Sequence, residues 1–143
     1  MTADSAAPNR LFAYGTLMMP AVRRAVCGVT LASRDAELMD YARFQLRQRV
    51  YPAIVPAPGA ATVGLLCEGL DAALWERLDA WESALYRREA VVARGADGML
   101  IAAQTYVLAA RHRHLLGTDA WSPAEFERLH LAAYLARWTD TTP

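Results

Sequence analysis

One acidic side chain, Glu82, lies where the pattern of a helix calls for an apolar one. Leu74 and Leu78 are one turn apart, and Glu82 is the next position on the same stripe. The negative end of the helix dipole and burial beside tryptophan both disfavour an ionised carboxylate there. Both effects raise the pKa of Glu82 toward the range of a general base near neutral pH. The alternative is a surface ion pair with Arg87 or Arg88.

A second candidate for chemistry is the corner at residues 11–17, which reads L-F-A-Y-G-T-L. The four residues before Gly15 are typical of a buried strand, and glycine lets the chain turn and a ligand approach the backbone. The amides of Gly15, Thr16 and Leu17 would then point at a small anion such as a carboxylate. The alternative is a corner that only changes the direction of the chain.

The other reactive side chains favour structural roles. His112 and His114 lie in an arginine-rich loop without the further ligands of a metal site, and His130 is typical of a histidine at the edge of a core. Cys27 and Cys67 are the only cysteines and are expected to be buried thiols, with neither a disulfide nor zinc. No metal and no cofactor are therefore expected.

Several enzyme classes are excluded by residues and motifs that the sequence lacks. It contains no lysine, which excludes Schiff-base chemistry on a side-chain amine, a phosphate-loop lysine and a serine–lysine dyad. The patterns G-x-S-x-G, G-x-G-x-x-G and H-E-x-x-H are also absent. The commonest hydrolase, dinucleotide-binding and zinc-protease interpretations are thereby removed.

The composition is that of one globular domain. Of the 143 residues, 55% are hydrophobic and 21% charged, which is enough to build a core. Fifteen basic and fifteen acidic residues cancel, which argues against nucleic acid or an anionic membrane as partner. A disordered tail is expected at residues 1–9 and a single domain at 10–143. Neither a signal peptide nor a bilayer-length apolar segment is recognised, so a cytoplasmic protein is expected. The alanine- and arginine-rich composition suggests a bacterial source.

The strands that must position these residues follow from apolar patterns and turn signals. Besides residues 11–14, strands are expected over Leu31 to Met39, Arg43 to Arg47, Thr62 to Glu68, Glu89 to Ala93 and Met99 to Leu108. Asp97 and Gly98 supply the turn of a hairpin between the last two. The segment 51–59 carries three prolines, so it is expected to be extended but unable to pair throughout as a central strand.

Three helices are expected. The first covers residues 21–27 between Pro20 and Gly28, and the second runs from a cap at Asp71 to about Glu82. The third begins at the capping sequence S-P-A-E of residues 122–125 and runs to about Trp138. Its buried side chains are expected to be Phe126, Leu129, Ala133 and Trp138. The expected fold class is α+β: a small, mixed, mostly antiparallel sheet, curled or closed as a barrel, with flanking helices.

Four motifs in one order give the chain a resemblance to a known family. They are Y-G-T-L at 14–17, Y-P-A-I-V-P at 51–56, L-D-A-W-E at 78–82 with Y-R-R at 86–88, and Q-T-Y-V at 104–107. This set resembles the gamma-glutamylcyclotransferase-like family, in the branch similar to the avirulence-induced plant proteins. The resemblance extends from about Arg10 to about Trp138 and implies a curled, barrel-like sheet with one cavity.

The resemblance also implies a site and a reaction. In the family's enzymes the loop matching Tyr14, Gly15, Thr16 and Leu17 binds the glutamyl end of the substrate, and the catalytic glutamate corresponds to Glu82. The resemblance also implies that Tyr86 and Tyr106 match tyrosines of the family's site. Tyr51 and Pro52 would lie in the cavity wall, near its mouth. The implied reaction is cyclisation of a small gamma-glutamyl compound, which releases 5-oxoproline and an amine or amino acid, with Glu82 as general acid and base.

The chain departs from the family pattern directly after the glutamate, where the enzymes commonly carry glycine and this sequence has Ser83. Glutathione, gamma-glutamyl amino acids, gamma-glutamyl amines and protected metabolites all remain possible substrates. The alternative to an enzyme is a non-catalytic binding or stress-response module that uses the same cavity, and a purely structural domain ranks third.

Overall fold

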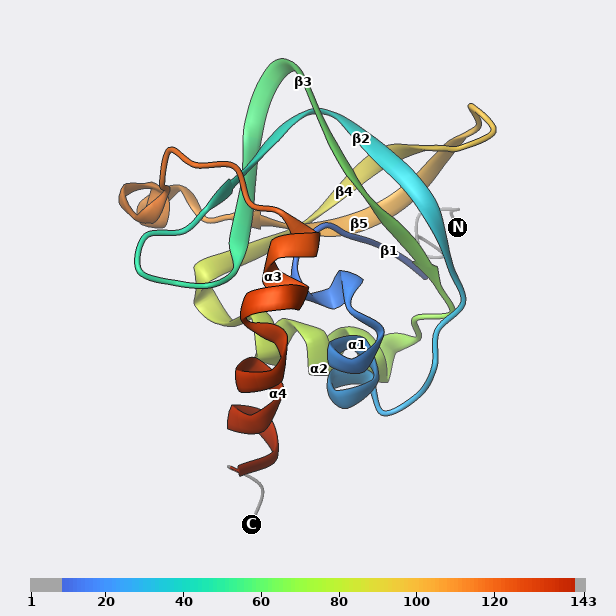
Figure 1. The fold of residues 1–143 in the computed structure, drawn as a ribbon. Coiled ribbons are helices and arrows are strands. Elements are labelled where there is room, and N and C mark those ends of the chain that lie inside the picture. Colours follow the sequence, from blue (N-terminus) through green and yellow to red (C-terminus); the bar gives the residue numbers. More distant parts are fainter. Residues whose placement is uncertain (1–8, 141–143) are drawn as a thin grey trace.

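Five strands form a closed barrel in the computed structural model, which describes residues 9–140 of the chain (Figure 1). Neighbours in the order β1-β3-β2-β4-β5 pair antiparallel, and one parallel pair, Leu11 with Gln104, joins β5 back to β1. The expected fold class is confirmed. The strands are β1 (Arg10–Ala13), β2 (Ser33–Gln45), β3 (Pro52–Glu68), β4 (Tyr86–Gly95) and β5 (Leu100–Leu108).

The first strand is buried on both faces. Leu11 and Ala13 pack among the residues that face the helices, whereas Phe12 packs inside the barrel. Because side chains alternate along a strand, burial on both faces explains the unbroken apolar run. The buried hydroxyl of Thr105 on β5 donates a hydrogen bond of 2.8 Å to the carbonyl of Phe12, which fixes the two strands at the point where the barrel closes.

Strands β2 and β3 are each continuous across a bulge and are therefore longer than the strands predicted from the sequence. The strands expected at 31–39 and 43–47 are parts of one strand, β2, whose register against β3 shifts between Met39 and Tyr41. Asp40 has a positive φ of 68° there, and its side chain accepts a hydrogen bond of 2.9 Å from the amide of Gly59. The proline segment pairs with β2 only as far as Pro56, so it does not pair throughout, as predicted.

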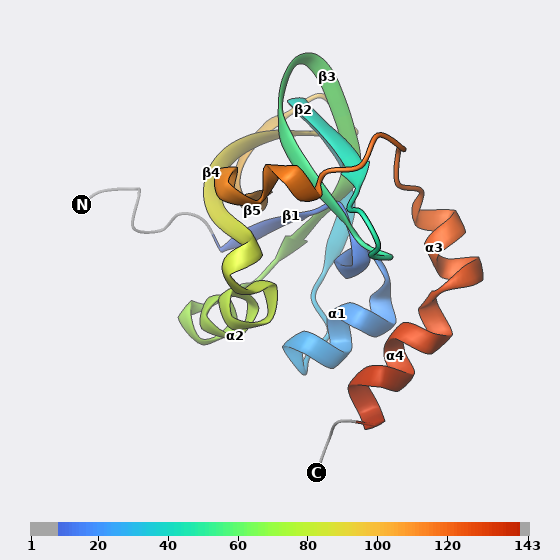
Figure 2. The same ribbon diagram turned by 90° about the vertical axis from the view of Figure 1, so that its left-hand side faces the viewer.

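The helices gather at one end of the barrel, with α1 and α2 side by side and α3 and α4 along the opposite flank (Figure 2). Asp71 caps α2 as predicted, by accepting a hydrogen bond of 2.9 Å from the amide of Leu74. No helix in the described range 9–140 is both long and apolar enough to cross a bilayer. The elements are α1 (Pro20–Cys27), α2 (Ala72–Glu82), α3 (Pro123–Leu129), α4 (Leu131–Asp140) and the 3-10 turns η2 (Thr16–Met18), η3 (Ser83–Leu85) and η4 (Ala110–Leu115).

The prediction of one C-terminal helix is wrong, because the chain breaks at His130. That residue ends α3 with φ −127° and ψ −18°, and α4 starts at the next position. The break rotates the apolar face: Leu129 is 53% exposed and Ala133 is also exposed, against expectation. Phe126 is buried as predicted, and Tyr134 packs edge-on against it at 5.4 Å between ring centroids. The predicted burial of Trp138 concerns a side chain outside the described part of the structure.

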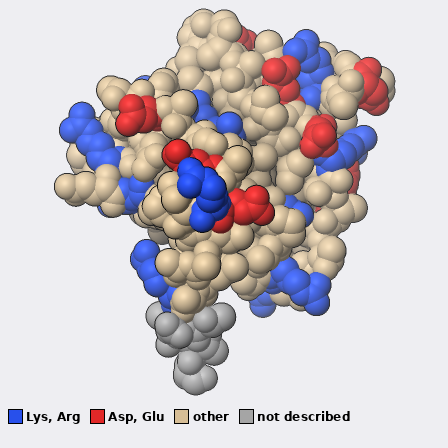
Figure 3. Space-filling view, in the orientation of Figure 1, with Lys and Arg blue, Asp and Glu red and all other residues tan. Residues whose placement is uncertain are grey.

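The surface carries mixed charges, and the start of the described chain is held by one backbone hydrogen bond. Acidic and basic side chains are mixed on the face seen in Figure 3, in keeping with the balanced charge of the sequence. The tail expected at residues 1–9 lies outside the described residues except for Asn9. The carbonyl of Asn9 accepts a hydrogen bond of 2.9 Å from the amide of Leu70.

Close packing at Gly64 predicts a large effect of one added methyl group. A Cβ at this position of β3 would overlap the carbonyl oxygen of Ala13 and lie 2.8 Å from the ring of Phe12. Backbone cannot yield there without moving the end of β1. We expect Gly64→Ala to lower the free energy of unfolding by ~1–3 kcal/mol, measured by urea denaturation.

Gly95→Ala is the matched control, because Gly64 and Gly95 both lie opposite Ala36 in the sheet. The nearest atom to a Cβ at Gly95 is a side-chain oxygen of Asp97 at 3.0 Å, which is free to move. Equal destabilisation by the two substitutions would show that the contact with β1 is not what matters.

The end of α2 predicts the opposite effect for a second substitution. Ser83 has φ 65° and ψ −169°, a conformation that is essentially restricted to glycine and costs a larger residue ~1–3 kcal/mol. Ser83, which stands where the enzymes of the resembled family commonly have glycine, is therefore a strained residue. We expect Ser83→Gly to raise the free energy of unfolding by about 1 kcal/mol, after allowance for the greater freedom of glycine in the unfolded chain.

Ala84→Gly tests the same region without relief of strain, because Ala84 is not among the residues with a positive φ. This control should lower the free energy of unfolding by about 0.5–1 kcal/mol. A loss of stability in both variants would contradict the assignment of strain to Ser83.

Candidate active site

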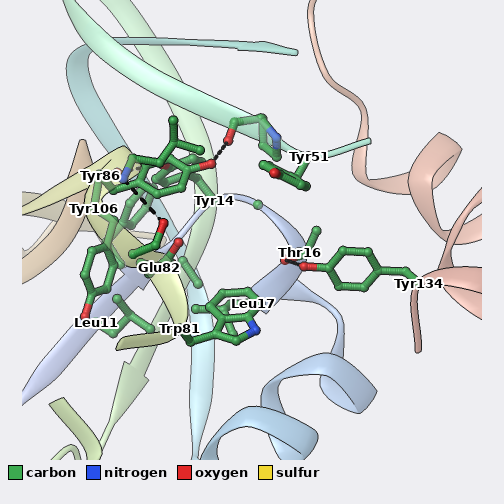
Figure 4. Close-up of a pocket in the computed structure, with 16 residues that line it drawn as sticks. Leu11, Tyr14, Thr16, Leu17, Tyr51, Trp81, Glu82, Tyr86, Tyr106 and Tyr134 are labelled. Atoms are coloured by element: carbon green, nitrogen blue, oxygen red, sulfur yellow. Dashed lines mark hydrogen bonds between the residues drawn. The ribbon is translucent and has the colours of Figure 1, made fainter. Parts of the chain in front are cut away.

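A cavity of about 220 Å³ opens beside the loop that follows β1 (Figure 4). It is built where the end of β1, the start of β3, the end of α2 and the strands β4 and β5 meet. All nine predicted site residues line it: Tyr14, Gly15, Thr16, Leu17, Tyr51, Pro52, Glu82, Tyr86 and Tyr106. Seven further lining residues were not predicted for the site: Leu11, Phe12, Ala13, Trp81, Ser83, Leu85 and Tyr134.

Glu82 presents its carboxylate to this cavity from the last position of α2. Burial, and then the negative charge of Asp79, raise its pKa to about 8. None of the described residues gives the Glu82 carboxylate a hydrogen bond or an ion pair. The surface pair considered as an alternative is absent from the described residues: neither Arg87 nor Arg88 pairs with Glu82, and Arg88 bonds to Asp79 instead, at 3.1 Å. Glu82 is therefore able to exchange a proton near neutral pH.

The loop at 14–17 is shaped by close packing against Pro52. Gly15 has a φ of −121°, so glycine is not required here for a left-handed backbone conformation. A Cβ on Gly15 would instead lie 3.1 Å from the ring of Pro52, and glycine permits that approach. The close approach that glycine permits here is therefore that of the cavity wall at Pro52, and the approach of a ligand stays a prediction.

Three backbone donors of the same loop have no acceptor among the described residues. Thr16–Met18 forms the 3-10 turn η2, in which the amides of Met18 and Met19 bond back to Gly15 and Thr16. The amides of Gly15, Thr16 and Leu17 precede those bonds and donate to no acceptor among the described residues. The donors that a small anion would require are therefore available beside the cavity.

Three tyrosines of the cavity have committed their hydroxyl protons to the protein. Tyr14 donates to the carbonyl of Tyr106 at 2.5 Å, Tyr86 donates to the carbonyl of Pro52 at 2.7 Å, and Tyr106 donates to Asp79 at 2.7 Å. Burial is the first cause that raises the pKa of each of these hydroxyls above its ordinary value. They stay neutral at physiological pH, and their oxygens remain able to accept hydrogen bonds from a ligand.

Tyr134 is the lining residue that sequence reasoning missed most completely. It comes from α4, and its hydroxyl lies 3.5 Å from the hydroxyl of Thr16, on the opposite side of the loop from Glu82 (Figure 4). Burial raises the pKa of Tyr134 as well. Its spacing from Phe126 signals the apolar face of a helix, but nothing local shows that this face reaches the loop after β1.

The histidines and cysteines lie away from this cavity, as far as the described lining shows. His112 and His114 sit on η4, with ring centroids 6.3 Å apart, and His130 contacts Phe126 at the break between α3 and α4. Cys27 and Cys67 are free and buried, and burial raises the pKa of both thiols. Within residues 9–140, no three side chains of the metal-binding types cluster.

Sequence comparisons identify the family of this chain. The chain matches the gamma-glutamyl cyclotransferase, AIG2-like family over residues 11–123. It is 33% identical over 130 residues to AIG2-like protein D of Arabidopsis thaliana, covering 89% of this chain and 84% of that protein. AIG2-like protein A of the same plant is 29% identical over 136 residues, covering 94% and 81%. These relatives are plant proteins and do not support the expected bacterial source.

Solved structures share the fold. A solution structure of an Arabidopsis thaliana protein matches with a TM-score of 0.70 at 26% identity, covering 97% of this chain and 98% of that one. A structure titled gamma-glutamyl cyclotransferase matches with a TM-score of 0.63 at 18% identity, covering 94% and 88%. The fold is thus a known one, and the chain belongs to the AIG2-like gamma-glutamyl cyclotransferase family.

Proposed function

We propose that this protein is a gamma-glutamyl cyclotransferase, which cyclises a small gamma-glutamyl compound to 5-oxoproline and releases an amine or amino acid. The observation that carries the proposal is the pairing, within one cavity, of the unpartnered Glu82 carboxylate with the free amides of Gly15, Thr16 and Leu17. A gamma-glutamyl group has the complementary ends: an α-carboxylate for the amides and an α-ammonium for the carboxylate. Membership of the family supports the same reaction.

The walls of the cavity favour this division of roles. Glu82 is the only charged side chain among the described lining residues, so binding of the α-carboxylate falls to backbone amides. The oxygens of Tyr14, Tyr86 and Tyr106 add acceptors for substrate N–H groups, because their own protons are already used. Donors from the loop at 15–17 and acceptors from the tyrosines therefore line one cavity.

The reaction needs few chemical groups, because nucleophile and electrophile belong to one molecule. Glu82 takes a proton from the α-ammonium, and the freed amine attacks the γ-carbonyl carbon. The new C–N bond closes a five-membered ring, and the bond to the departing nitrogen breaks. Two protons leave the attacking nitrogen: one is delivered to the departing nitrogen through Glu82, and the other ends on the released amine or in solvent. Such acid–base catalysis is typically worth about 10²–10⁴-fold.

The oxyanion that forms at the γ-carbonyl requires a donor other than the three tyrosines. Each of their hydroxyl protons is held by a protein acceptor. Backbone amides of the loop at 15–17 are suitable donors beside the cavity, because they are fixed before the substrate binds. The hydroxyls of Tyr51 and Ser83 also belong to the cavity lining. Main-chain amides would thus bind the substrate's α-carboxylate and also stabilise the oxyanion at the γ-carbonyl.

Replacement of Glu82 tests the proposal. We expect the wild-type protein to release 5-oxoproline from at least one member of a panel of gamma-glutamyl dipeptides, gamma-glutamyl amines and glutathione. Glu82→Gln keeps the size of the side chain but cannot exchange a proton, so its turnover should fall at least about 100-fold. Release of 5-oxoproline is measured by chromatography at pH 8.

Glu76→Gln is the control, because Glu76 is an exposed residue of the same helix outside the cavity. It should retain wild-type turnover. Full activity in Glu82→Gln would refute the role of Glu82. A wild-type protein that binds 5-oxoproline yet releases none from the whole panel would refute the cyclotransferase and favour the binding module.

The raised pKa of Glu82, about 8, also predicts how stability depends on pH. Glutamate in an unfolded chain has a pKa of about 4.3, so at intermediate pH the folded protein holds a proton that the unfolded chain has lost. The free energy of unfolding therefore decreases as pH rises from about 4.3 to 8. We expect Glu82→Gln to match wild type at pH 4.5 and to exceed it by ~1–3 kcal/mol at pH 8.5, in urea denaturation. A difference that does not change with pH would contradict the burial of an ionisable Glu82.

A further inference from the structure

A second carboxylate, Asp79, lies beside Glu82 without lining the cavity. The two residues are three positions apart on α2, so their side chains are neighbours on the helix surface. The side chain of Asp79 is 44% exposed, and Asp79 is not among the residues that line the cavity. Like charges at this spacing repel each other, so the placement needs a compensating purpose or partner.

Asp79 is held by contacts from two strands. Its carboxylate accepts a hydrogen bond of 2.7 Å from the hydroxyl of Tyr106 on β5 and pairs at 3.1 Å with Arg88 on β4. The guanidinium of Arg88 lies 4.6 Å from the ring centroid of Trp75, one turn before Asp79 on α2. A cation and a hydroxyl from two strands therefore contact one carboxylate, and the ring of Trp75 holds the cation in place.

We propose that Asp79 is a positioning residue of the active site, which anchors Tyr106 in the cavity wall and keeps a balanced negative charge one helical turn from Glu82. The inference rests on the proposed function, in which Glu82 is the general acid and base and Tyr106 an acceptor wall. Asp79 touches neither the cavity nor a substrate within it, so it acts through these two residues.

The charge of Asp79 affects the pKa of Glu82. A negative charge nearby disfavours the ionised carboxylate, in line with Asp79 being the second cause, after burial, of the raised pKa of Glu82. Arg88 limits that repulsion because it pairs with Asp79.

The other titratable groups near Glu82 are tyrosines from the remaining elements, namely Tyr14, Tyr86, Tyr106 and Tyr134, whose pKa values are all raised. They are neutral near pH 8. In the described structure the adjustable charges near Glu82 are therefore those of Asp79 and Arg88.

Titration of Glu82 followed by carboxyl ¹³C NMR tests the inference without any need for turnover, and its signal is assigned from the spectrum of Glu82→Gln. Asp79→Asn keeps an acceptor oxygen for Tyr106 but removes the charge, so the midpoint of Glu82 should fall by roughly one pH unit. Arg88→Met leaves the Asp79 charge unopposed and should raise the midpoint. Tyr106→Phe and Glu76→Gln should leave the midpoint within about 0.2 units of wild type.

Opposite shifts in Asp79→Asn and Arg88→Met are the signature that a purely structural role would not give. An unchanged midpoint in Asp79→Asn, or an equal shift in Tyr106→Phe, would overturn the proposal. The pH profile of kcat/KM for 5-oxoproline release should move with the NMR midpoint. Shifted midpoints without turnover in any variant would refute the cyclotransferase while supporting the link between Asp79 and Glu82.

Discussion

The carboxylate of Glu82 is half-buried in the cavity wall, with no cation paired to it among residues 9–140, and the rest of the cavity is best understood from that constraint. A buried carboxylate must pair, take up a proton or face a ligand. The chain prevents pairing by ending α2 at Glu82, turning through η3 and starting β4 at Tyr86, which sends Arg88 to Asp79 instead. Ser83 bears the strain of this turn in a conformation suited to glycine. The strained turn therefore accompanies the position of Glu82 in the cavity wall.

Barrel closure supplies what faces Glu82. The single parallel pair of Leu11 with Gln104 sets β1 beside β5, so the loop after β1 reaches the same cavity as the end of α2. That loop carries amides without a partner among the described residues, and the tyrosine hydroxyls of the same cavity have committed protons. Donors and acceptors thus line one space of about 220 Å³, into which we propose that a gamma-glutamyl group fits.

Local patterns predicted the parts of this arrangement that are local. The apolar run of β1, the glycine corner and the stripe that ends in Glu82 are readable because each depends on residues within one turn or one strand. Tyr51, Pro52, Tyr86 and Tyr106 came from the family resemblance alone, since no spacing in the sequence brings them together. The continuity of β2 and β3 was missed because it depends on a bond between Asp40 and Gly59, 19 residues apart. Tyr134 was missed because the break at His130 turns α4 toward Thr16.

A crystal structure with 5-oxoproline bound would test the central claim most directly, because the product carries the groups that the loop amides and Glu82 are proposed to bind. The account predicts that its carboxylate accepts hydrogen bonds from the amides of Gly15, Thr16 and Leu17, and that its ring nitrogen lies within hydrogen-bond distance of Glu82. A product bound in the reverse orientation, or outside this cavity, would contradict the assignment of the loop to the carboxylate and of Glu82 to the amine.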